Sequence, residues 1–300
     1  MRTVTETYGD RGRTWLLELP TLLLDIARRN GLSLAPPFPN LTYNYVAPAI
    51  MADGTEAVLK VCVPNPEFNS EISALTHFNG VGSVSLLHAD ASSGLLLLER
   101  LIPGEPLTIM ALGDDASDDK ATSIACNVIR SLTRKLPPTS PFRTTADLAQ
   151  GFLRLRSRFG GGVGPFPRDL VDLAERVWEE LEATAQDAVL LHGDLHHDNI
   201  IYCQPRGAWL AIDPKGYIGD PGFETGALLR NLWRDRCEVA EPEKRLNRRL
   251  DKMSDELNIA RSRIQQWGFC QAMLSVWWSY EDGDPDWASG LDIAAMISAC

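Results

Sequence analysis

The residues with the clearest chemical potential form one polar octapeptide, HGDLHHDN, at positions 192–199. Apolar runs at 188–191 and 200–202 flank it, and a polar segment enclosed in this way is typical of a functional site. Within it, the carboxylate of Asp194 can accept a hydrogen bond from a hydroxyl group and orient that hydroxyl for attack. We expect His192 to anchor the segment through hydrogen bonds to the backbone. The octapeptide is therefore a candidate catalytic loop.

The segment that follows the octapeptide has the pattern of a β-hairpin. Two apolar runs, 200–203 and 208–213, flank a turn at 204–207 that contains proline and glycine. Folding the chain about this turn brings Asn199 beside Asp213. An amide and a carboxylate offer the hard oxygen ligands that Mg²⁺ takes when phosphates and water complete its coordination shell. The pattern predicts a magnesium site at this end of the hairpin.

These residues carry a resemblance to a known family. The octapeptide, followed by AIDPKG at 211–216, resembles the Brenner-type motif and its partner in the aminoglycoside phosphotransferase superfamily. Together with VLKV at 58–61 and LLERL at 97–101, it is similar more narrowly to the streptomycin 6-kinase and hydroxyurea phosphotransferase group. The four segments stand in the same order as in that group.

The resemblance implies an ATP-dependent phosphotransferase with an alcohol group as acceptor. Asp194 then corresponds to the catalytic carboxylate, and Asn199 and Asp213 correspond to the Mg²⁺ ligands. Phosphoryl transfer needs little covalent chemistry from the protein, so positioning and charge neutralisation provide most of the catalysis. The implied cofactors are ATP and Mg²⁺, with GTP left open as the nucleotide. The implied partner is a small-molecule antibiotic.

The resemblance also assigns roles in the first hundred residues. Lys60 corresponds to the ligand of the α- and β-phosphates, and Glu71 to its ion-pair partner, although Glu67 lies one helical turn earlier and remains an alternative. The segment from Glu99 to Leu101 corresponds to the hinge, where backbone groups bind adenine. Because backbone groups do this, the side chains there carry little information.

The hydrophobic periodicity predicts an α+β chain with a small lobe followed by a mostly α lobe, and the resemblance implies that the two form a protein-kinase-like two-lobe fold. A small β-rich N-terminal lobe (1–100) is expected to bind nucleotide, and a larger, mostly α C-terminal lobe (101–300) to hold the catalytic and substrate groups. In the first lobe the patterns predict helices at 15–30 and 67–78 and strands at 43–51, 55–63, 84–88 and 94–100. In the second they predict helices at 119–136, 144–158, 168–186, 224–235, 241–257 and 260–281.

Some features depart from protein kinases. No P-loop motif is present, and the glycine cluster at 160–164 is interpreted as a loop between helices. The sequence NLTYNY at 40–45 stands where a glycine-rich loop would be, which leaves open how the triphosphate is covered. The aspartate of Asp-Pro-Lys at 213–215 replaces that of Asp-Phe-Gly, which argues against a protein substrate.

The composition is that of a soluble chain. The net charge of −11 disfavours nucleic acid and anionic membranes as partners. No long apolar run or leader segment is evident, so we expect a cytoplasmic protein. The six cysteines are scattered without a CxxC pair, which predicts reduced thiols. Nothing in the sequence indicates an oligomeric state.

The acceptor is the least determined feature. The stretch YEDGDPD at 280–286 follows two tryptophans, and its residues Glu281 and Asp282 are candidates for binding a cationic antibiotic, although a solvated loop would have the same composition. Streptomycin, at its 6-hydroxyl, is the first candidate substrate, and hydroxyurea or another hydroxylated metabolite is the alternative. The imidazole and carboxylate groups of 192–198 could instead form a metal-dependent hydrolase site, and a non-catalytic nucleotide-binding module is a third possibility.

Overall fold

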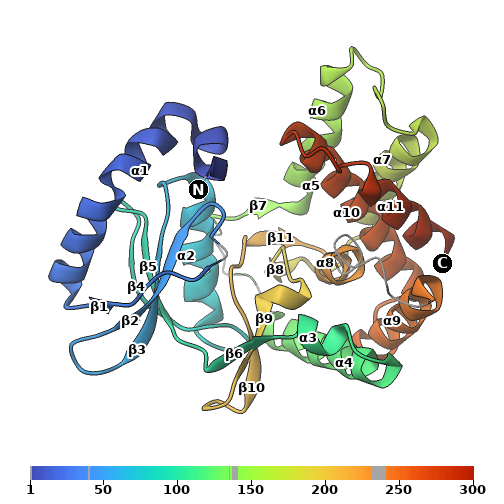
Figure 1. Ribbon diagram of the computed structural model, residues 1–300. Helices are drawn as coiled ribbons and strands as arrows, with labels where there is room; N and C mark the ends of the chain where they lie inside the picture. Colours follow the sequence, from blue (N-terminus) through green and yellow to red (C-terminus); the bar gives the residue numbers. More distant parts are fainter. Residues whose placement is uncertain (1, 40, 135, 137–140, 232–240) are drawn as a thin grey trace.

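The computed structural model describes residues 2–39, 41–134, 136, 141–231 and 241–300. The chain forms two lobes, a smaller N-terminal lobe built on one sheet and a larger lobe dominated by helices (Figure 1). The predicted α+β, two-lobe arrangement is confirmed. Among the described residues, every helix is too short or too polar to cross a lipid bilayer.

The N-terminal lobe is a five-stranded antiparallel sheet with a helix on each face. The strand order is β1-β2-β3-β5-β4. Its strands are β1 (Ser33–Leu34), β2 (Tyr45–Ile50), β3 (Glu56–Val61), β4 (Leu86–Asp90) and β5 (Leu95–Glu99). Its helices are α1 (Arg2–Asn30) and α2 (Pro66–Phe78), which lie on opposite sides of the sheet in Figure 1.

Strand alternation explains the uninterrupted apolar run of β5. Leu95 and Leu97 pack against α1, whereas Leu96 and Leu98 pack toward α2. Because successive side chains of a strand point to opposite faces, a strand covered on both sides has to be apolar throughout. The run at 94–100 was therefore correctly predicted as a buried strand.

The helix α1 is longer than the sequence predicts. It begins at Arg2 rather than at residue 15, and the chain is kinked at Gly9, where φ is 56°. Gly9 and Gly12 are poor helix formers, so the local sequence suggests a later start. Val4 and Trp15 are both buried against the sheet, and this tertiary packing outweighs the weak local preference.

The larger lobe contains most of the helices. They are α3 (Thr108–Ala111), α4 (Asp115–Leu132), α5 (Thr145–Leu148), α6 (Gln150–Arg158), α7 (Arg168–Ala183), α8 (Gly226–Arg230), α9 (Pro242–Leu257), α10 (Arg261–Glu281) and α11 (Ser289–Ala299), with 3-10 turns η1 (His197–Asn199) and η2 (Pro221–Thr225). The predicted helix at 144–158 is two helices, and α11 was not predicted. The end of the predicted helix at 224–235 lies outside the described residues.

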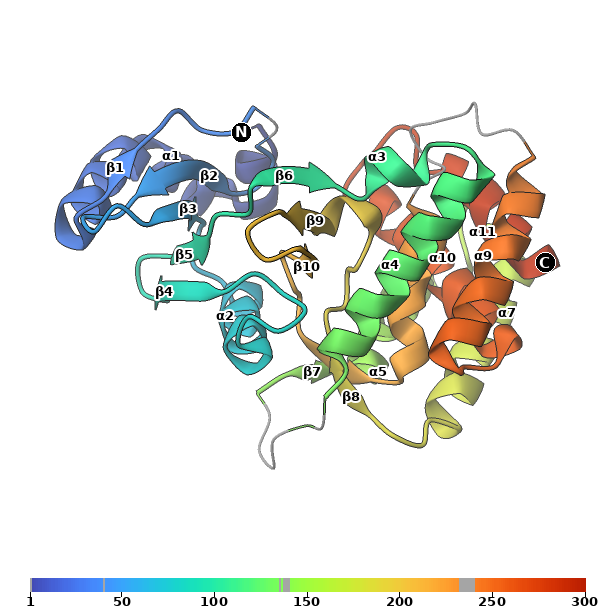
Figure 2. The same cartoon turned by 90° about the horizontal axis from the view of Figure 1, so that it is seen from below.

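Two small sheets connect the lobes and carry the candidate catalytic segments. One has the order β10-β9-β6 and the other β7-β11-β8. Their strands are β6 (Pro103–Pro106), β7 (Arg143–Thr144), β8 (Val189–Leu191), β9 (Ile200–Cys203), β10 (Ala208–Ala211) and β11 (Tyr217–Gly219). The β9–β10 hairpin was correctly predicted, and it lies between the lobes (Figure 2).

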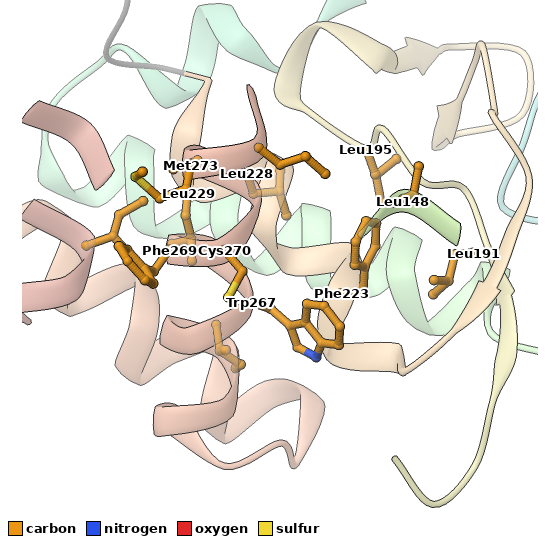
Figure 3. Close-up of a cluster of buried hydrophobic side chains, with 14 of the residues drawn as sticks. Leu148, Leu191, Leu195, Phe223, Leu228, Leu229, Trp267, Phe269, Cys270 and Met273 are labelled. Carbon is orange, nitrogen blue, oxygen red and sulfur yellow. The ribbon is translucent and has the colours of Figure 1, made fainter. Parts of the chain in front are cut away.

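The core of the larger lobe reaches the candidate catalytic loop. Trp267 and Cys270 of α10 are fully buried and lie in one hydrophobic cluster with Phe223 and Leu195 (Figure 3). Leu195 is the residue after Asp194, so its burial fixes the backbone of the loop against the hydrophobic core of the larger lobe. Burying such a side chain contributes about 2 kcal/mol.

The described cysteines are free thiols. Cys62, Cys126, Cys203 and Cys270 are buried and Cys300 is partly exposed, while Cys237 lies outside the described residues. This agrees with the prediction of reduced cysteines for the five that are described.

Candidate active site

A cavity of about 650 Å³ opens between the two lobes. It is lined by Lys60 and Glu71 from the N-terminal lobe and by Asp194 and Asp213 from the larger one. Side chains that the sequence separates by more than a hundred residues thus converge on one space. Of the other predicted site residues, Glu281 and Asp282 line the same cavity, whereas Asn199, Glu99 and Leu101 are not part of its lining.

Lys60 is the central cation of this cavity. It lies on the face of β3 opposite to Leu59 and Val61, which pack against α1, so strand alternation turns it toward α2. Its ammonium lies 2.7 and 2.8 Å from the two carboxylate oxygens of Glu71, and it also donates to Oδ1 of Asp213. Glu71 rather than Glu67 is therefore the partner, as predicted.

The charges of this group are set by burial and by one another. Burial would lower the pKa of Lys60, but Asp213 and Glu71 together raise it above its ordinary value. Burial would raise the pKa of Asp213, but Lys60 and Lys215 hold it well below its ordinary range. Burial raises the pKa of Glu71 to about 7, although the Lys60 ammonium opposes this rise. Lys60 and Asp213 are thus an ionised pair at neutral pH.

The HGDLHHDN loop (residues 192–199) is held by buried polar contacts. His192 is fully buried, its Nε2 lies 2.8 Å from the carbonyl oxygen of Ile212, and its Nδ1 accepts from the backbone N–H of Asp194 at 3.3 Å. Burial lowers the pKa of His192 to about 4, which keeps the ring neutral. The prediction that His192 anchors the loop is confirmed.

A carboxylate that the sequence did not reveal completes this anchor. Glu224 lies in the 3-10 turn η2. Its carboxylate accepts a hydrogen bond from the backbone N–H of His192 at 2.6 Å and another from that of Gly193 at 2.9 Å. Burial raises the pKa of Glu224 to about 7, although both hydrogen bonds oppose the rise. Gly193 has φ of 85°, and a Cβ there would lie 2.4 Å from the Tyr217 ring, so only glycine fits.

Asp194 is engaged with the larger lobe. Its side chain is 28% exposed, and its Oδ1 lies 3.1 Å from Nη2 of Arg230. Burial would raise the pKa of Asp194, but the Arg230 guanidinium outweighs it and the pKa falls below its ordinary value. The carboxylate is therefore ionised and able to accept a hydrogen bond from a hydroxyl group.

Asn199 and Asp213 lie at the same end of the hairpin. The backbone N–H of Ile212 donates to the carbonyl oxygen of Asn199 at 2.9 Å, and Asn199 Nδ2 donates to the carbonyl oxygen of Asp194, also at 2.9 Å. Because Nδ2 is used in this way, Oδ1 is the atom left for another ligand. Asp213 has a left-handed backbone with φ of 64° and faces the cavity. An amide oxygen and a carboxylate fit the requirements of Mg²⁺.

The predicted hinge connects the two lobes outside the cavity. Glu99 ends β5, and its side chain accepts from the backbone N–H of Ser85 at 3.1 Å and pairs with Arg206 Nη1 at 3.0 Å. Arg206 belongs to the β9–β10 turn, so this ion pair ties the hairpin to the N-terminal lobe. The Glu99 side chain thus has a structural contact, and Leu101 lies two residues further along the same connection.

The two acidic residues predicted for the acceptor differ in their surroundings. Glu281, the last residue of α10, pairs with Arg154 of α6 at 3.1 Å. Asp282 makes no side-chain hydrogen bond or ion pair with any residue that the structure describes. Burial and the neighbouring Glu281 raise the pKa of Asp282. Asp282 is thus the better placed of the two to bind a cation.

Several charged residues of this region were not predicted from the sequence, among them Arg154, Lys215, Glu224 and Arg230. Only Lys215 had a local signal, because it stands within the IDPKG motif. The others act through contacts between residues far apart in the sequence, which no local pattern encodes.

Comparisons with known proteins agree with this geometry. The structure superposes on the crystal structure of the aminoglycoside phosphotransferase APH(4)-Ia with a TM-score of 0.65 at 14% identity, covering 93% of this chain and 99% of that one. This likeness shows that the chain has the protein-kinase-like fold.

The family follows from sequence comparison. The family model described as aminoglycoside/hydroxyurea antibiotic resistance kinase matches residues 42–283, and the chain belongs to this family. It is 30% identical to a streptomycin 6-kinase of Streptomyces glaucescens, over 97% of this chain and 92% of that protein. It is 33% identical to a hydroxyurea phosphotransferase of Kitasatospora aureofaciens, over 92% and 77%.

Family membership confirms the resemblance and decides against the metal-dependent hydrolase. The described part of the chain contains no group of three or more His, Cys, Asp or Glu side chains arranged to hold a metal ion.

Proposed function

We propose that this protein transfers the γ-phosphate of ATP to a hydroxyl group of an aminoglycoside-type antibiotic and thereby confers resistance, with the 6-hydroxyl of streptomycin as the first candidate. The observation that carries the proposal is the contact of Lys60 with both Glu71 and Asp213, in a cavity that also contains Asp194. The streptomycin 6-kinase that matches nearly the whole chain supports the choice of acceptor. Hydroxyurea is the second candidate, because a hydroxyurea phosphotransferase is a relative of similar identity.

In this proposal the N-terminal lobe binds the nucleotide. Lys60 contacts the α- and β-phosphates, and Glu71 holds the lysine in place. Backbone groups between Glu99 and Leu101 bind the adenine ring. Backbone contacts of this kind do not by themselves choose between ATP and GTP, so both nucleotides enter the test.

Asn199 and Asp213 are the proposed Mg²⁺ ligands, through Oδ1 and a carboxylate oxygen. The bound ion would neutralise phosphate charge during the reaction. For this role Asp213 has to exchange part of its contact with Lys60. The depressed pKa of Asp213 keeps it anionic throughout.

Asp194 is the proposed catalytic carboxylate. It accepts a hydrogen bond from the acceptor hydroxyl and orients the oxygen toward the γ-phosphorus. A bond forms between that oxygen and phosphorus, and the bond from phosphorus to the bridging oxygen breaks. The electron pair stays on the β-phosphate of ADP, and the hydroxyl proton passes to Asp194 and then to water. Arg230 orients the carboxylate through its 3.1 Å contact.

The acceptor is proposed to lie against the wall formed by Glu281 and Asp282. A polycationic antibiotic would pair with Asp282 directly. Glu281 already pairs with Arg154, so it would contribute mainly to the negative electrostatic potential of this wall.

Three expectations from the sequence stay predictions. The first is the boundary between lobes 1–100 and 101–300. The second is a cytoplasmic location, and the third is the absence of nucleic-acid and membrane partners.

The experiment is a screen of the purified protein against a panel of antibiotics with ATP and GTP, read as release of nucleoside diphosphate. The panel contains streptomycin, other aminocyclitols, hydroxyurea and neutral hydroxylated compounds. Release that depends on streptomycin supports the proposal. Release of nucleoside diphosphate with hydroxyurea alone would make hydroxyurea the acceptor. No release with any acceptor would refute the proposed function.

A further inference from the structure

Two cations of the cavity, Lys60 and Arg230, are each paired with a carboxylate. Lys60 is paired with Glu71 and Asp213, and Arg230 with Asp194. His192 of the HGDLHHDN loop is uncharged, because burial lowers its pKa to about 4. A phosphoryl group leaving ATP carries negative charge that has to be neutralised, and no glycine-rich loop is present to supply backbone N–H groups.

Lys215 stands apart from these paired cations. It lines the cavity with Asp194 and Asp213 and is partly buried. Among the residues that the structure describes, its ammonium makes no ion pair and no side-chain hydrogen bond. A lysine ammonium is a cation at neutral pH.

The backbone of Lys215 is fixed to the candidate catalytic loop. Its N–H donates to the carbonyl oxygen of His192 at 2.7 Å, and the N–H of Gly216 donates to the same oxygen at 3.2 Å. Ser70 of α2 donates to the carbonyl oxygen of Gly216 at 3.1 Å. The lysine therefore extends from a segment held by both lobes, next to the two carboxylates between which the phosphoryl group would pass.

We propose that Lys215 is a catalytic residue that binds the γ-phosphoryl group and neutralises its charge as the group moves from ADP to the acceptor oxygen. The lysine keeps its protons throughout. The bonds that form and break are those given above, and Lys215 stabilises the transferring oxygens electrostatically. This inference rests on the proposed phosphotransfer, and it explains how the triphosphate is held without a glycine-rich loop.

The role predicts a split between two nucleotides. Lys215→Met, which keeps the length of the side chain, should weaken binding of the β,γ-imido analogue of ATP by about tenfold and leave ADP binding within about twofold, because only the analogue has a γ-phosphoryl group. With acceptor present, kcat should fall by about a hundredfold to a thousandfold, as for other lost contacts to a developing anion. Lys215→Arg should restore part of the affinity for the analogue and part of kcat, since it keeps the positive charge.

Lys120→Met is the matched control, because it makes the same substitution and the same charge change at an exposed position of α4. It should leave both affinities and kcat unchanged. Titration calorimetry measures nucleotide binding without an acceptor. The role of Lys215 can therefore be refuted while the proposed acceptor stands, and the proposed acceptor can be refuted while the role of Lys215 stands.

Three results would overturn the inference. One is equal weakening of ADP and the analogue in Lys215→Met, which would mean a structural role or a contact to the inner phosphates. Another is a Lys215→Met enzyme with wild-type kcat. The third is a Lys215→Arg enzyme that melts at the wild-type temperature yet is as impaired as Lys215→Met.

Discussion

Glu224 makes the stability of this protein depend on pH in a way that one substitution can reveal. The carboxylate is 4% exposed and accepts the backbone N–H groups of His192 and Gly193. Its pKa rises from an ordinary 4.5 to about 7 on folding. This rise corresponds to about 3 kcal/mol of unfolding free energy.

The sign follows from the direction of the shift. Because the folded protein binds the proton more tightly than the unfolded chain, this stabilisation is fully present below the unfolded pKa and is lost as the pH rises through the folded one. Between pH 5.5 and pH 8.5 the loss amounts to about 2 kcal/mol. Glu224→Gln cannot ionise and does not show it. The amide also leaves one backbone N–H unsatisfied, which costs about 1–3 kcal/mol at all pH values.

The assay is urea unfolding of wild type and Glu224→Gln at several pH values in this range. We expect the variant to be less stable than the wild type, and the difference to be about 2 kcal/mol larger at pH 5.5 than at pH 8.5. Contributions from Glu71 and other groups cancel in the difference. Glu18→Gln, at an exposed position of α1, is the control and should give a difference near zero at every pH. A Glu224→Gln difference that does not change with pH would refute the reasoning.

The remaining predictions concern catalysis and binding. Asp194→Asn should keep nucleotide affinity and lose phosphoryl transfer by several orders of magnitude, since only the orientation of the hydroxyl is removed; turnover near the wild-type rate would remove Asp194 from its role. Nucleotide should raise the melting temperature more with Mg²⁺ than without, because Asn199 and Asp213 bind the ion together with phosphate oxygens; tightly bound zinc with metal-independent ATP binding would contradict this. Asp282→Asn should raise KM for streptomycin more than Glu281→Gln, whose carboxylate is already paired, and leave KM for ATP unchanged. KM for the antibiotic should also rise with salt at nearly constant kcat, and a salt-independent KM would argue against an acidic acceptor wall.

Much of the fold was predictable because its signals are local. The β2–β3 hairpin follows from alternating apolar residues around Asp53 and Gly54, and α2 follows from its helical spacing. Asn65 caps α2 by accepting from the backbone N–H of Phe68 at 3.1 Å, which is again a local contact. Such contacts are encoded within a few residues, so periodicity and turn chemistry detect them.

The failures have a common physical cause. The first turns of α1 form because Val4 and Trp15 are buried against a distant sheet, and that packing is invisible in the local sequence. Glu281 stays a candidate for binding the acceptor, but its ion pair with Arg154, which is distant in the sequence, was not predicted. Ion pairs often join residues that are far apart in the sequence. A local motif can therefore identify a carboxylate but not the cation that pairs with it.

The candidate site falls between these two cases. The HGDLHHDN and IDPKG motifs brought Asp194 and Asp213 together correctly, because a hairpin connects them. Lys60 and Glu71 were identified through the family resemblance, and the hydrogen-bond distances between their side chains support that pairing. The support provided by Glu224 had no sequence signal of its own.

The most direct test of the central claim is mass spectrometry of streptomycin after incubation with the purified protein, ATP and Mg²⁺. The account predicts that the drug gains one phosphate group, that one ADP forms for each drug molecule modified, and that Asp194→Asn yields no product. Unmodified streptomycin, alongside phosphorylation of a neutral hydroxylated compound, would contradict the proposed acceptor.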